Sequence, residues 1–526
     1  MGQIPTVDGI IARGYLPKEL PPAFTSAICG SVLANNSLVL PNQFIHGRQS
    51  SKCTAHNLLT RGSLRRRLGI PNPIHFFRLA HFIVDEWTQL TNIAAKSHMS
   101  LSNPVWQEGP RAIGRTAEEV FKDRDIRRAR IRSKSRYLLR ADINQFYHSM
   151  YTHSISWAVH DKVTAKAKRK PSELLGNVLD GLVRDCQDGQ STGMPIGPDT
   201  SLLIAEIILT ANDLELFSRG IKNAFRIIDD YEFGCESLSE AEQTREALQE
   251  LLYNYQLVLN SEKTHIVELP VVIEALPISQ LRAYQFNSRN PINEIKQHNE
   301  IMHYFDQAFA FSREYPDDAI LKYAIAKLSR LSLLVLQANW PFYQNLLLQC
   351  AIVEPSTMDI VLGELIRYRD SGYSLDLDHI RDVFNKIIGR HAPLGHGSEV
   401  AWALWGSIVL DVSISDDNAN KSVSMNDSIV AILMLDARKK GLISSNIDFK
   451  RFQSYMTTDE LYGDQWLVVY EANVKGWLPS LDKIDHVDQD KCFAFLKKEG
   501  VYFYDDSVSG RIEYKPPRQP PAVEGY

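Results

Sequence analysis

Two patterns of hydrophobic and polar positions divide the chain. Between residues 137 and 272, short apolar runs of strand length alternate with longer segments that have apolar residues at helical spacing. After about residue 290 the strand-like runs stop. Segments such as DDAILKYAIAKLSRLSLLVLQ and SEVAWALWGSIVL then keep an apolar face over several helical turns. The pattern predicts an α/β region followed by an all-helical region.

The helical half has short polar connectors between its predicted helices, which favours stacked helical pairs of a HEAT-like type, although no fixed repeat period is visible. Its tryptophans Trp402, Trp405 and Trp466 are expected in the core. From Lys515 the tail KPPRQPPAVEGY is expected to be extended and flexible.

The first 136 residues are less regular. Residues 1–60 read as loop-rich, and the basic run RGSLRRR at 61–67 precedes GIPNPIHFFRLAHFIVDEW, a turn followed by an amphipathic helix. A second basic stretch covers residues 111–136. Basic runs are more often solvated faces than binding sites, so their neighbours must decide their role.

A pair of aspartates raises the main chemical question. In FRIIDDYEFG, Asp229 and Asp230 lie between two apolar runs that read as a β-hairpin, so the pair is either a polar turn or a metal site. A third carboxylate, Asp142, ends a predicted strand at Tyr137–Ala141. Carboxylates from separate strands that converge on two divalent ions are what two-metal nucleotidyl transfer requires.

Two further motifs fit this chemistry. The loop STGMPIGPDTS, with Gly193, Pro195 and Gly197, runs into an apolar helix that begins near Ser201. Glycines there would let the backbone approach a base or a phosphate. Lys263 in LNSEKT follows a predicted helix and is placed to neutralise or protonate a departing pyrophosphate.

Taken in order, these motifs resemble the palm of reverse transcriptases. Asp142 matches motif A, GMPIGPDTS motif B, IIDDY motif C and LNSEKT motif D. The chain departs from the family in having Ile196 in place of the motif B glutamine and Ile227 in place of the motif C tyrosine. Both positions normally touch primer or nucleotide, which puts ordinary fidelity and processivity in doubt.

The resemblance implies a right-hand polymerase fold of the α/β class with a helical C-terminal region. Expected boundaries are 1–136 for the N-terminal and fingers region, 137–275 for the palm, 276–514 for the helical thumb and repeat region, and 515–526 for the tail. The implied enzyme is an RNA-directed DNA polymerase that uses dNTPs and two Mg²⁺ ions, with Mn²⁺ as a substitute.

It also implies roles for single residues. Asp142, Asp229, Asp230 and the backbone of Ile143 would hold the metal ions, with Lys263 as a motif D acid. Tyr147 would lie beneath the incoming sugar and exclude a 2′-hydroxyl, although Tyr147 or the neighbouring Phe146 also reads as a core aromatic. The residues expected to contact nucleotide or template are Phe146, Tyr147, Gly193, Pro195, Gly197, Ser201, Arg65, Arg66, Arg67, Lys134 and Arg136. Arginine suits phosphate because its planar fork pairs with two oxygens.

Outside the palm, RGYLPKELPPAF, RRRLGIPNP, INQFYHSMYTHSI and GHGSEVAWALW are similar to bacterial reverse transcriptases of antiphage defence and abortive infection. This similarity implies a bacterial cytoplasmic enzyme that makes DNA from a noncoding RNA, and homo-oligomers through the helical region. Two rivals remain: a protein-primed polymerase without a template, and a silent RNA-binding scaffold. The Cys- or His-rich endonuclease module of group II intron maturases is missing.

Composition adds limits rather than a function. The net charge of −5 does not point to nucleic acid, but a basic groove can sit on an acidic protein. Six cysteines without CxxC spacing argue against zinc and disulfides. No apolar run is long enough for a membrane span, so a soluble intracellular protein is expected. The start MGQIPT matches the myristoylation pattern literally, a short pattern that often occurs by accident.

Other acidic and histidine clusters are weaker candidates. His391, His396 and Glu399 in GRHAPLGHGSE are expected in a loop that leads into a helix rather than at a metal ion. Three further aspartate pairs have no upstream partner carboxylate and are treated as decoys: 317–318, 416–417 and 505–506.

Overall fold

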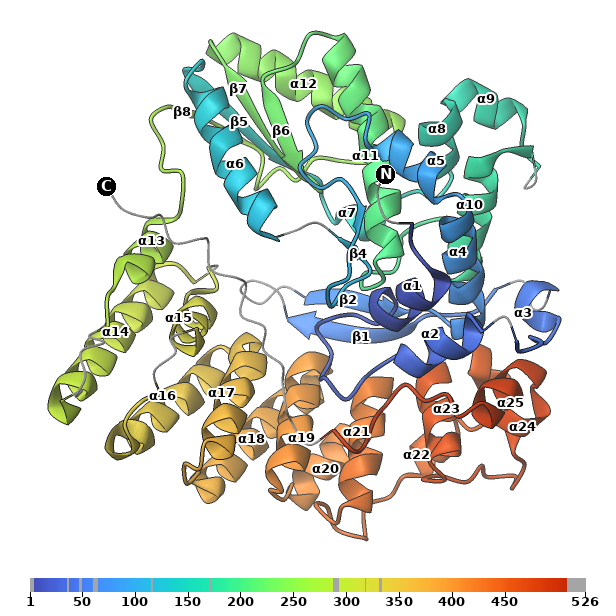
Figure 1. Cartoon of the computed structure of the whole chain (residues 1–526), viewed down its shortest axis with the longest axis vertical. Coiled ribbons are helices and arrows are strands. Elements are labelled where there is room, and N and C mark those ends of the chain that lie inside the picture. Colours follow the sequence, from blue (N-terminus) through green and yellow to red (C-terminus); the bar gives the residue numbers. More distant parts are fainter. Residues whose placement is uncertain are drawn as a thin grey trace.

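A four-stranded antiparallel sheet forms the centre of the palm. Its order is β6 (Ala224–Ile227), β7 (Asp230–Cys235), β5 (Tyr137–Asp142) and β8 (His265–Glu268). One face is covered by α11 (Thr200–Ser218) and α12 (Leu238–Asn254), and α6 (Ala117–Arg132) crosses the other (Figure 1). The predicted strand at 137–141 and the predicted hairpin around Asp229 are both confirmed.

The structure is a computed structural model. It describes residues 4–35, 37–46, 50–59, 65–114, 117–170, 173–286, 293–316, 318–330 and 334–508, and for 117–123 the backbone only. The expected tail at 515–526 and Asp317 of the first decoy pair lie outside these residues.

The fingers contain more helix than the sequence predicted. Residues 1–60, expected as loops, include α1 (Val7–Gly14), α2 (Ala27–Leu33), α3 (Gln43–His46) and the strand β1 (Thr54–Leu59). The first of these short helices is stabilised by a polar cap, because the Thr6 hydroxyl accepts a hydrogen bond from the Gly9 amide.

β1 pairs with β2 (Arg65–Ile70) in a hairpin, and the expected turn and amphipathic helix follow as α4 (Pro73–Asp85). Asn72 caps α4 and Pro73 occupies its first turn. The remaining fingers elements are α5 (Trp87–Ala94), β3 (Val105–Trp106) and β4 (Ile113–Gly114). Four helices follow β5 in the sequence before α11: α7 (Phe146–Ser149), α8 (Ser154–His160), α9 (Lys162–Ala167) and α10 (Leu175–Asp185).

After β8 the described chain is helical, as predicted. The longer helices pack against their near neighbours in sequence, for example α16 against α17 and α18, and α19 against α18 and α21. The helices are α13 (Leu276–Ala283), α14 (Glu294–Glu314), α15 (Ile320–Ser329), α16 (Trp340–Val353), α17 (Met358–Asp370), α18 (Leu377–His391), α19 (Gly397–Leu410), α20 (Asp416–Val423), α21 (Ser428–Lys439), α22 (Lys450–Gln453), α23 (Trp466–Val474), α24 (His486–Gln489) and α25 (Lys491–Lys498).

Two of the three tryptophans expected in this core, Trp405 and Trp466, are fully buried. Trp402 is half-buried and donates a hydrogen bond to the Glu19 carbonyl of the fingers. The aspartates of the decoy pairs have structural roles. Asp416 and Asp417 lie in the first turn of α20, and Asp506 forms ion pairs with Lys439 and Lys475.

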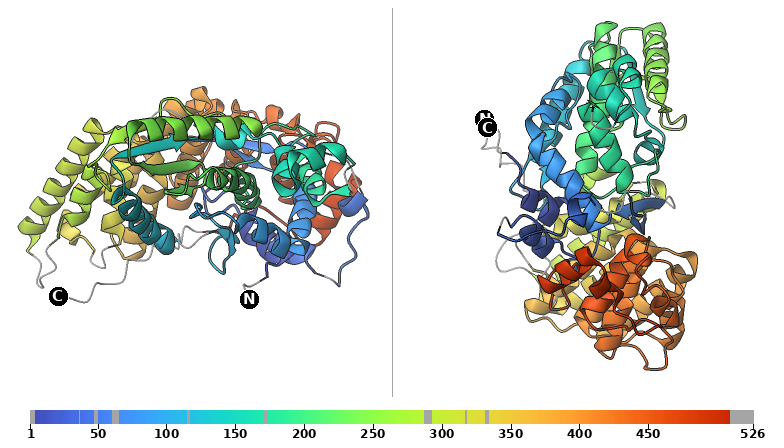
Figure 2. Two further views of the ribbon diagram at one scale, coloured as in Figure 1. Left: turned by 90° about the horizontal axis from the view of Figure 1, so that it is seen from above. Right: turned by 90° about the vertical axis from the view of Figure 1, so that its right-hand side faces the viewer.

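The helical region curves away from the palm and returns to the fingers. Figure 2 shows the palm and the last helices at opposite ends, with the fingers between them. The β1–β2 hairpin rests on α19 and α21. Buried contacts join them: His56 Nδ1 lies 2.8 Å from Asp427 Oδ2, and Trp466 Nε1 donates to the Ile70 carbonyl at 3.1 Å. Fingers and C-terminal helices therefore share one core.

An ion pair at this junction should stabilise the fold. Arg65 holds both carboxylate oxygens of Glu399, whose side chain is 1% exposed. Arg65→Ala leaves that carboxylate buried and unpaired, so we expect a loss of about 3 kcal/mol of unfolding free energy in urea denaturation. The control Lys421→Ala breaks an exposed pair with Asp417 and should cost less than about 0.5 kcal/mol. Equal losses in the two variants would contradict the assignment.

Candidate active site

The three predicted metal-binding aspartates meet at one end of the central strands of the palm sheet, where β5 ends and β7 begins. Asp142, the last residue of β5, is the direct cross-strand partner of Asp230, the first residue of β7. Asp229 lies beside them in the two-residue turn that joins β6 to β7. Directly opposed residues on paired strands have neighbouring side chains. The fold thus gathers carboxylates from two separate parts of the sequence.

The turn itself has an unusual backbone. Ile228, which precedes Asp229, has a φ of +54°, in the left-handed region that β-branched residues rarely adopt. Such a conformation persists only where surrounding contacts hold it.

The electrostatics of the cluster favour a bound cation. Burial raises the pKa of Asp229 to about 6, and the negative charges of Asp230 and Asp142 add to the effect. Lys263 Nζ donates a hydrogen bond of 3.1 Å to Asp142 Oδ2 from a largely exposed position. Oxygen donors with excess negative charge are what Mg²⁺ and Mn²⁺ prefer, so the donor set fits the predicted ions. Ile143, whose carbonyl was the fourth predicted ligand, directly follows Asp142.

Three cavities of about 360, 390 and 480 Å³ lie around the palm. The cavity of about 480 Å³ adjoins the turn that carries Asp229. Its walls come from the fingers, from motifs A and B and from the turn of motif C. The lining includes Lys18, Arg66, Arg111, Arg124, Tyr147, Ile196, Gly197, Ser201, Ile227 and Ile228. This volume is within the usual range for small-molecule sites. Both positions that depart from the family pattern, 196 and 227, form part of its wall.

The motif B loop is fixed from both sides. Gly197 has a φ of +132°, and a Cβ there would meet Pro17 at 2.5 Å, so glycine is required. Ser201 Oγ donates to the Pro195 carbonyl at 2.6 Å, and the Gly69 amide of β2 donates to the Ile196 carbonyl at 2.9 Å. The helix predicted near Ser201 begins at Thr200.

Sequence reasoning missed the residues that order this loop. Arg111 Nε donates to Asp199 Oδ1 at 2.6 Å, and its other nitrogens donate to the carbonyls of Leu16 and Gly197. The available signal was Asp199 at the start of an apolar helix, directly after the glycine and proline of the loop.

The two motif A aromatics separate into different roles. Phe146 is 2% exposed and packs in the core, which leaves almost no surface for the predicted contact with nucleotide. Tyr147 is half-buried and lines the cavity of about 480 Å³. Successive residues of a helix point in different directions, which is why only one of the two reaches the cavity.

The predicted phosphate-binding residues are dispersed. Arg66 lines the cavity beside the aspartates, and Arg67 lines a second cavity of about 390 Å³ with Gly193 and Pro195. Arg65 is not available to phosphate there, because Glu399 holds it. Arg136 is exposed and donates to Glu268 at 3.1 Å. Lys134 lies at the opposite ends of the strands, in a third cavity described below.

Of the histidine cluster, only His396 lies in the connection that leads into α19; His391 ends α18, and Glu399 lies in the first turn of α19. Among the described residues, His391, His396 and Glu399 have ligand atoms within 4.8 Å of one another. Burial alone would raise the pKa of Glu399, but the hydrogen bonds and charge of Arg65 lower it. Burial lowers the pKa of both histidines. With Glu399 already neutralised by Arg65, the cluster does not fit a cation.

No helix in the described part of the chain is long and apolar enough to cross a membrane. The six cysteines are unpaired thiols there, as expected.

One family model matches the palm and the segments on either side of it. Residues 86–297 match the family model described as "Reverse transcriptase (RNA-dependent DNA polymerase)". This segment is less than half of the chain and is similar to a reverse transcriptase domain. It contains Asp142, Asp229, Asp230 and Lys263, and such domains catalyse nucleotidyl transfer in RNA-directed DNA polymerases. Fingers and palm of this type, followed by a helical region, confirm the predicted fold class.

Solved structures give a more distant likeness. Apo telomerase from Candida tropicalis has 12% identity and a TM-score of 0.33, over 62% of this chain and 64% of that one. Telomerase from Candida albicans in complex with a TWJ fragment of telomeric RNA has 12% identity and a TM-score of 0.30, over 63% and 62%. The chain thus spans less than two thirds of either telomerase. A search of curated protein sequences gives no match.

The raised pKa of Asp229 leads to a test of the metal site. Because folding raises this pKa to about 6, the folded protein binds a proton that the unfolded chain releases near pH 4. Metal-free stability should therefore fall as pH rises from about 4 through 6. Asp229→Asn removes this penalty, so we expect its metal-free melting temperature at pH 7 to rise by about 1–3 °C.

The same variant should lose the stabilisation that millimolar Mg²⁺ or Mn²⁺ gives to the wild type in thermal denaturation. Asp506→Asn is the matched control, because Asp506 pairs with Lys475 and Lys439 far from the palm and its pKa is lowered to about 2. It should be less stable than the wild type at pH 7 and keep its response to metal. Equal metal responses in Asp229→Asn and the wild type would contradict the site.

Proposed function

We propose that this protein is an RNA-directed DNA polymerase that adds deoxynucleotides to a primer 3′-hydroxyl and releases pyrophosphate. Residues 1–136 act as fingers, 137–275 as palm and 276–514 as a helical region that includes or replaces the thumb. One observation carries the proposal: three carboxylates converge at the edge of a reverse transcriptase palm, beside a cavity walled by motif A, motif B and arginines of the fingers.

Asp142, Asp229, Asp230 and the Ile143 carbonyl would hold two Mg²⁺ ions, or Mn²⁺ in their place. When bound, such ions activate the attacking hydroxyl and stabilise the leaving pyrophosphate. Lys263 already contacts Asp142, so its ammonium group can balance charge or give a proton on the leaving side.

The cavity of about 480 Å³ would bind the dNTP. Arg66 and Arg124 reach it from the fingers and from α6, where their forked donors suit a triphosphate. The Tyr147 ring would lie beneath the sugar and select against a 2′-hydroxyl. Ile196 and Ile227 present an apolar wall where the family usually has glutamine and tyrosine, so base and primer contacts there must be made by shape rather than by hydrogen bonds.

A basic patch separate from the active site supports an RNA partner. Arg128 and Arg132 of α6 turn inward and donate to the buried carboxylate of Glu232. The outward side of the same helix end, with the start of β6, lines a cavity of about 360 Å³. We define the α6 patch as Arg127, Arg130, Lys134 and Lys222 from this lining. None of the four forms an ion pair with a described residue. Glu236 and Glu240 also line this cavity, which leaves it an excess of two positive charges.

The α6 patch should contribute to RNA affinity through phosphate contacts. We expect Arg127→Gln, Arg130→Gln and Lys134→Gln together to weaken binding of a structured RNA at least 10-fold at low salt. The slope of log affinity against log salt should become shallower by about 2–3, because each of the three lost phosphate contacts removes about 0.7–0.9 of a released counterion.

A control with the same change in charge replaces Arg282, Arg381 and Lys421 by Gln, since these exposed cations have carboxylate partners of their own. It should bind RNA as the wild type does. An unchanged salt slope in the α6 variant would contradict the assignment.

The stretches RGYLPKELPPAF and GHGSEVAWALW support a narrower proposal, that the enzyme acts in antiphage defence and copies an associated noncoding RNA. The test is sequencing of nucleic acid that co-purifies with the wild type and with the Asp229→Ala, Asp230→Ala variant, after incubation with labelled dNTPs and Mg²⁺. DNA complementary to a bound RNA, made by the wild type alone, is expected.

Other outcomes would change the assignment. DNA of simple sequence that is released only by proteinase would replace templated synthesis by protein-primed synthesis. RNA bound to both proteins, with DNA made by neither, would leave only a scaffold.

A further inference from the structure

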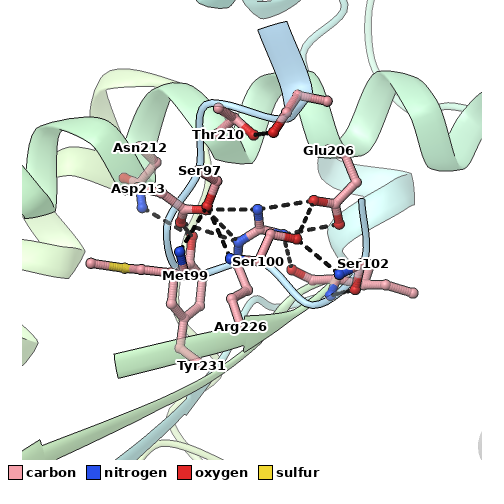
Figure 3. Close-up of polar contacts among 12 residues, drawn as sticks. Ser97, Met99, Ser100, Ser102, Glu206, Thr210, Asn212, Asp213, Arg226 and Tyr231 are labelled. Atoms are coloured by element: carbon pink, nitrogen blue, oxygen red, sulfur yellow. Dashed lines mark hydrogen bonds and ion pairs between the residues drawn. The ribbon is translucent and has the colours of Figure 1, made fainter. Parts of the chain in front are cut away.

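A buried arginine lies directly beneath the aspartate turn. Arg226 of β6 is 0% exposed, and each of its five N–H groups has an acceptor (Figure 3). Nε donates to Asp213, Nη2 donates to Glu206 and Asp213, and Nη1 donates to Glu206 at 3.0 Å. The remaining Nη1 donor reaches the Ile228 carbonyl at 2.8 Å. One donor of a fully buried guanidinium is therefore used on the turn that carries Asp229.

The two carboxylates are fixed in turn. Asp213 and Glu206, both on α11, are buried, and Asp213 accepts further hydrogen bonds from Ser97 at 2.6 Å and Tyr231 at 3.0 Å. Ser100 Oγ donates to Glu206 at 2.7 Å. Because both carboxylates and the side chains that donate to them are buried, moving any one of these groups would leave a buried charge with fewer hydrogen bonds. The guanidinium is thus held in one position.

The segment at residues 97–102 completes the arrangement. It runs beside β6 as a short parallel partner, since the Arg226 amide donates to the Met99 carbonyl and the Leu101 amide donates to the Arg226 carbonyl, both at 2.8 Å. At its end, Ser102 Oγ accepts a hydrogen bond of 2.8 Å from the Ile228 amide. Ile228 therefore has its N–H held by Ser102 and its C=O held by Arg226.

These two contacts act on the residue with the unfavourable backbone. Ile228 has a φ of +54°, and a β-branched residue leaves this region when nothing restrains its peptide groups. The carbonyl that Arg226 holds belongs to the peptide bond between Ile228 and Asp229. Its orientation therefore fixes the direction in which the Asp229 and Asp230 side chains leave the backbone.

We propose that Ser102 and Arg226 are positioning residues that clamp Ile228 and thereby aim the paired aspartates for nucleotidyl transfer. This inference rests on the proposed polymerase function. Neither Ser102 nor Arg226 lines the cavity proposed for the dNTP, so their loss should affect the rate of the chemical step more than nucleotide affinity.

Ser102→Ala tests the clamp with the smallest change, because it removes the acceptor for the Ile228 amide and keeps the ion pairs of Arg226. We expect kcat at saturating dNTP and Mg²⁺ to fall about 10- to 100-fold on a primed template, since small misplacements of reacting groups have effects of this size. KM for dNTP should stay within twofold of the wild type.

A second readout does not depend on activity. Hydrogen exchange of the peptide that spans Ile228, measured without metal or nucleotide, should be faster in Ser102→Ala because its amide has lost its acceptor.

Thr210→Val is the matched control. Thr210 is buried on α11 and donates a hydrogen bond of 3.1 Å to the Ala94 carbonyl, near the network but without a contact to the turn. It should lose stability comparably while kcat and the exchange of the turn stay as in the wild type.

The outcomes separate this inference from the proposed function. A wild type that makes no DNA would defeat the polymerase proposal, and the exchange data would still report on the clamp. An active wild type with unchanged kcat or unchanged exchange in Ser102→Ala would overturn the clamp. Equal losses of kcat in Ser102→Ala and Thr210→Val would also overturn it, because the effect would then be one of general stability.

Discussion

The pairing of β5 with β7 is the contact on which the site depends. It sets Asp142 opposite Asp230 and leaves Asp229 in the adjoining turn. A shift of this register by one residue would turn one carboxylate to the other face of the sheet. The register is held by buried residues such as Leu139 and Phe233, which are direct cross-strand partners and have almost no exposed surface.

Groups of positive and negative charge lie in separate places around this pair of strands. At the strand ends the aspartates repel one another, which contributes to the raised pKa of Asp229. Below them, Arg226 is enclosed by two carboxylates and reaches the turn. Around them, Arg66 and Arg124 line the cavity, and the α6 patch lies at the far strand ends. The net charge of −5 for the whole chain conceals this local separation of sign.

The C-terminal helices connect this site to the rest of the molecule through the β1–β2 hairpin. Side chains along a strand point alternately to its two faces, so Arg66 points away from the face that carries Arg65 and Arg67. Arg65 binds Glu399 of the helical region, Arg66 lines the cavity at the aspartates, and Arg67 lines the cavity that also includes Asp464. The helical region thereby supports the strand that carries two of the cavity-lining arginines.

The sequence by itself determined the elements whose signals are local. Strand and helix periods, the Gly-Pro loop of motif B and the aspartates of motifs A and C were readable because each depends on residues close together in the chain. Only the tertiary structure decided which side chains meet across long separations. Arg65 and Glu399 form an ion pair although they are 334 positions apart. Phe146 and Tyr147 are neighbours in the sequence, and only the direction of each side chain decides which one is buried. The carboxylate partners of Arg226 come from α11, and the segment 97–102 that packs beside it holds the aspartate turn. A side chain's partner depends on packing and orientation, and these arise only when distant elements pack together.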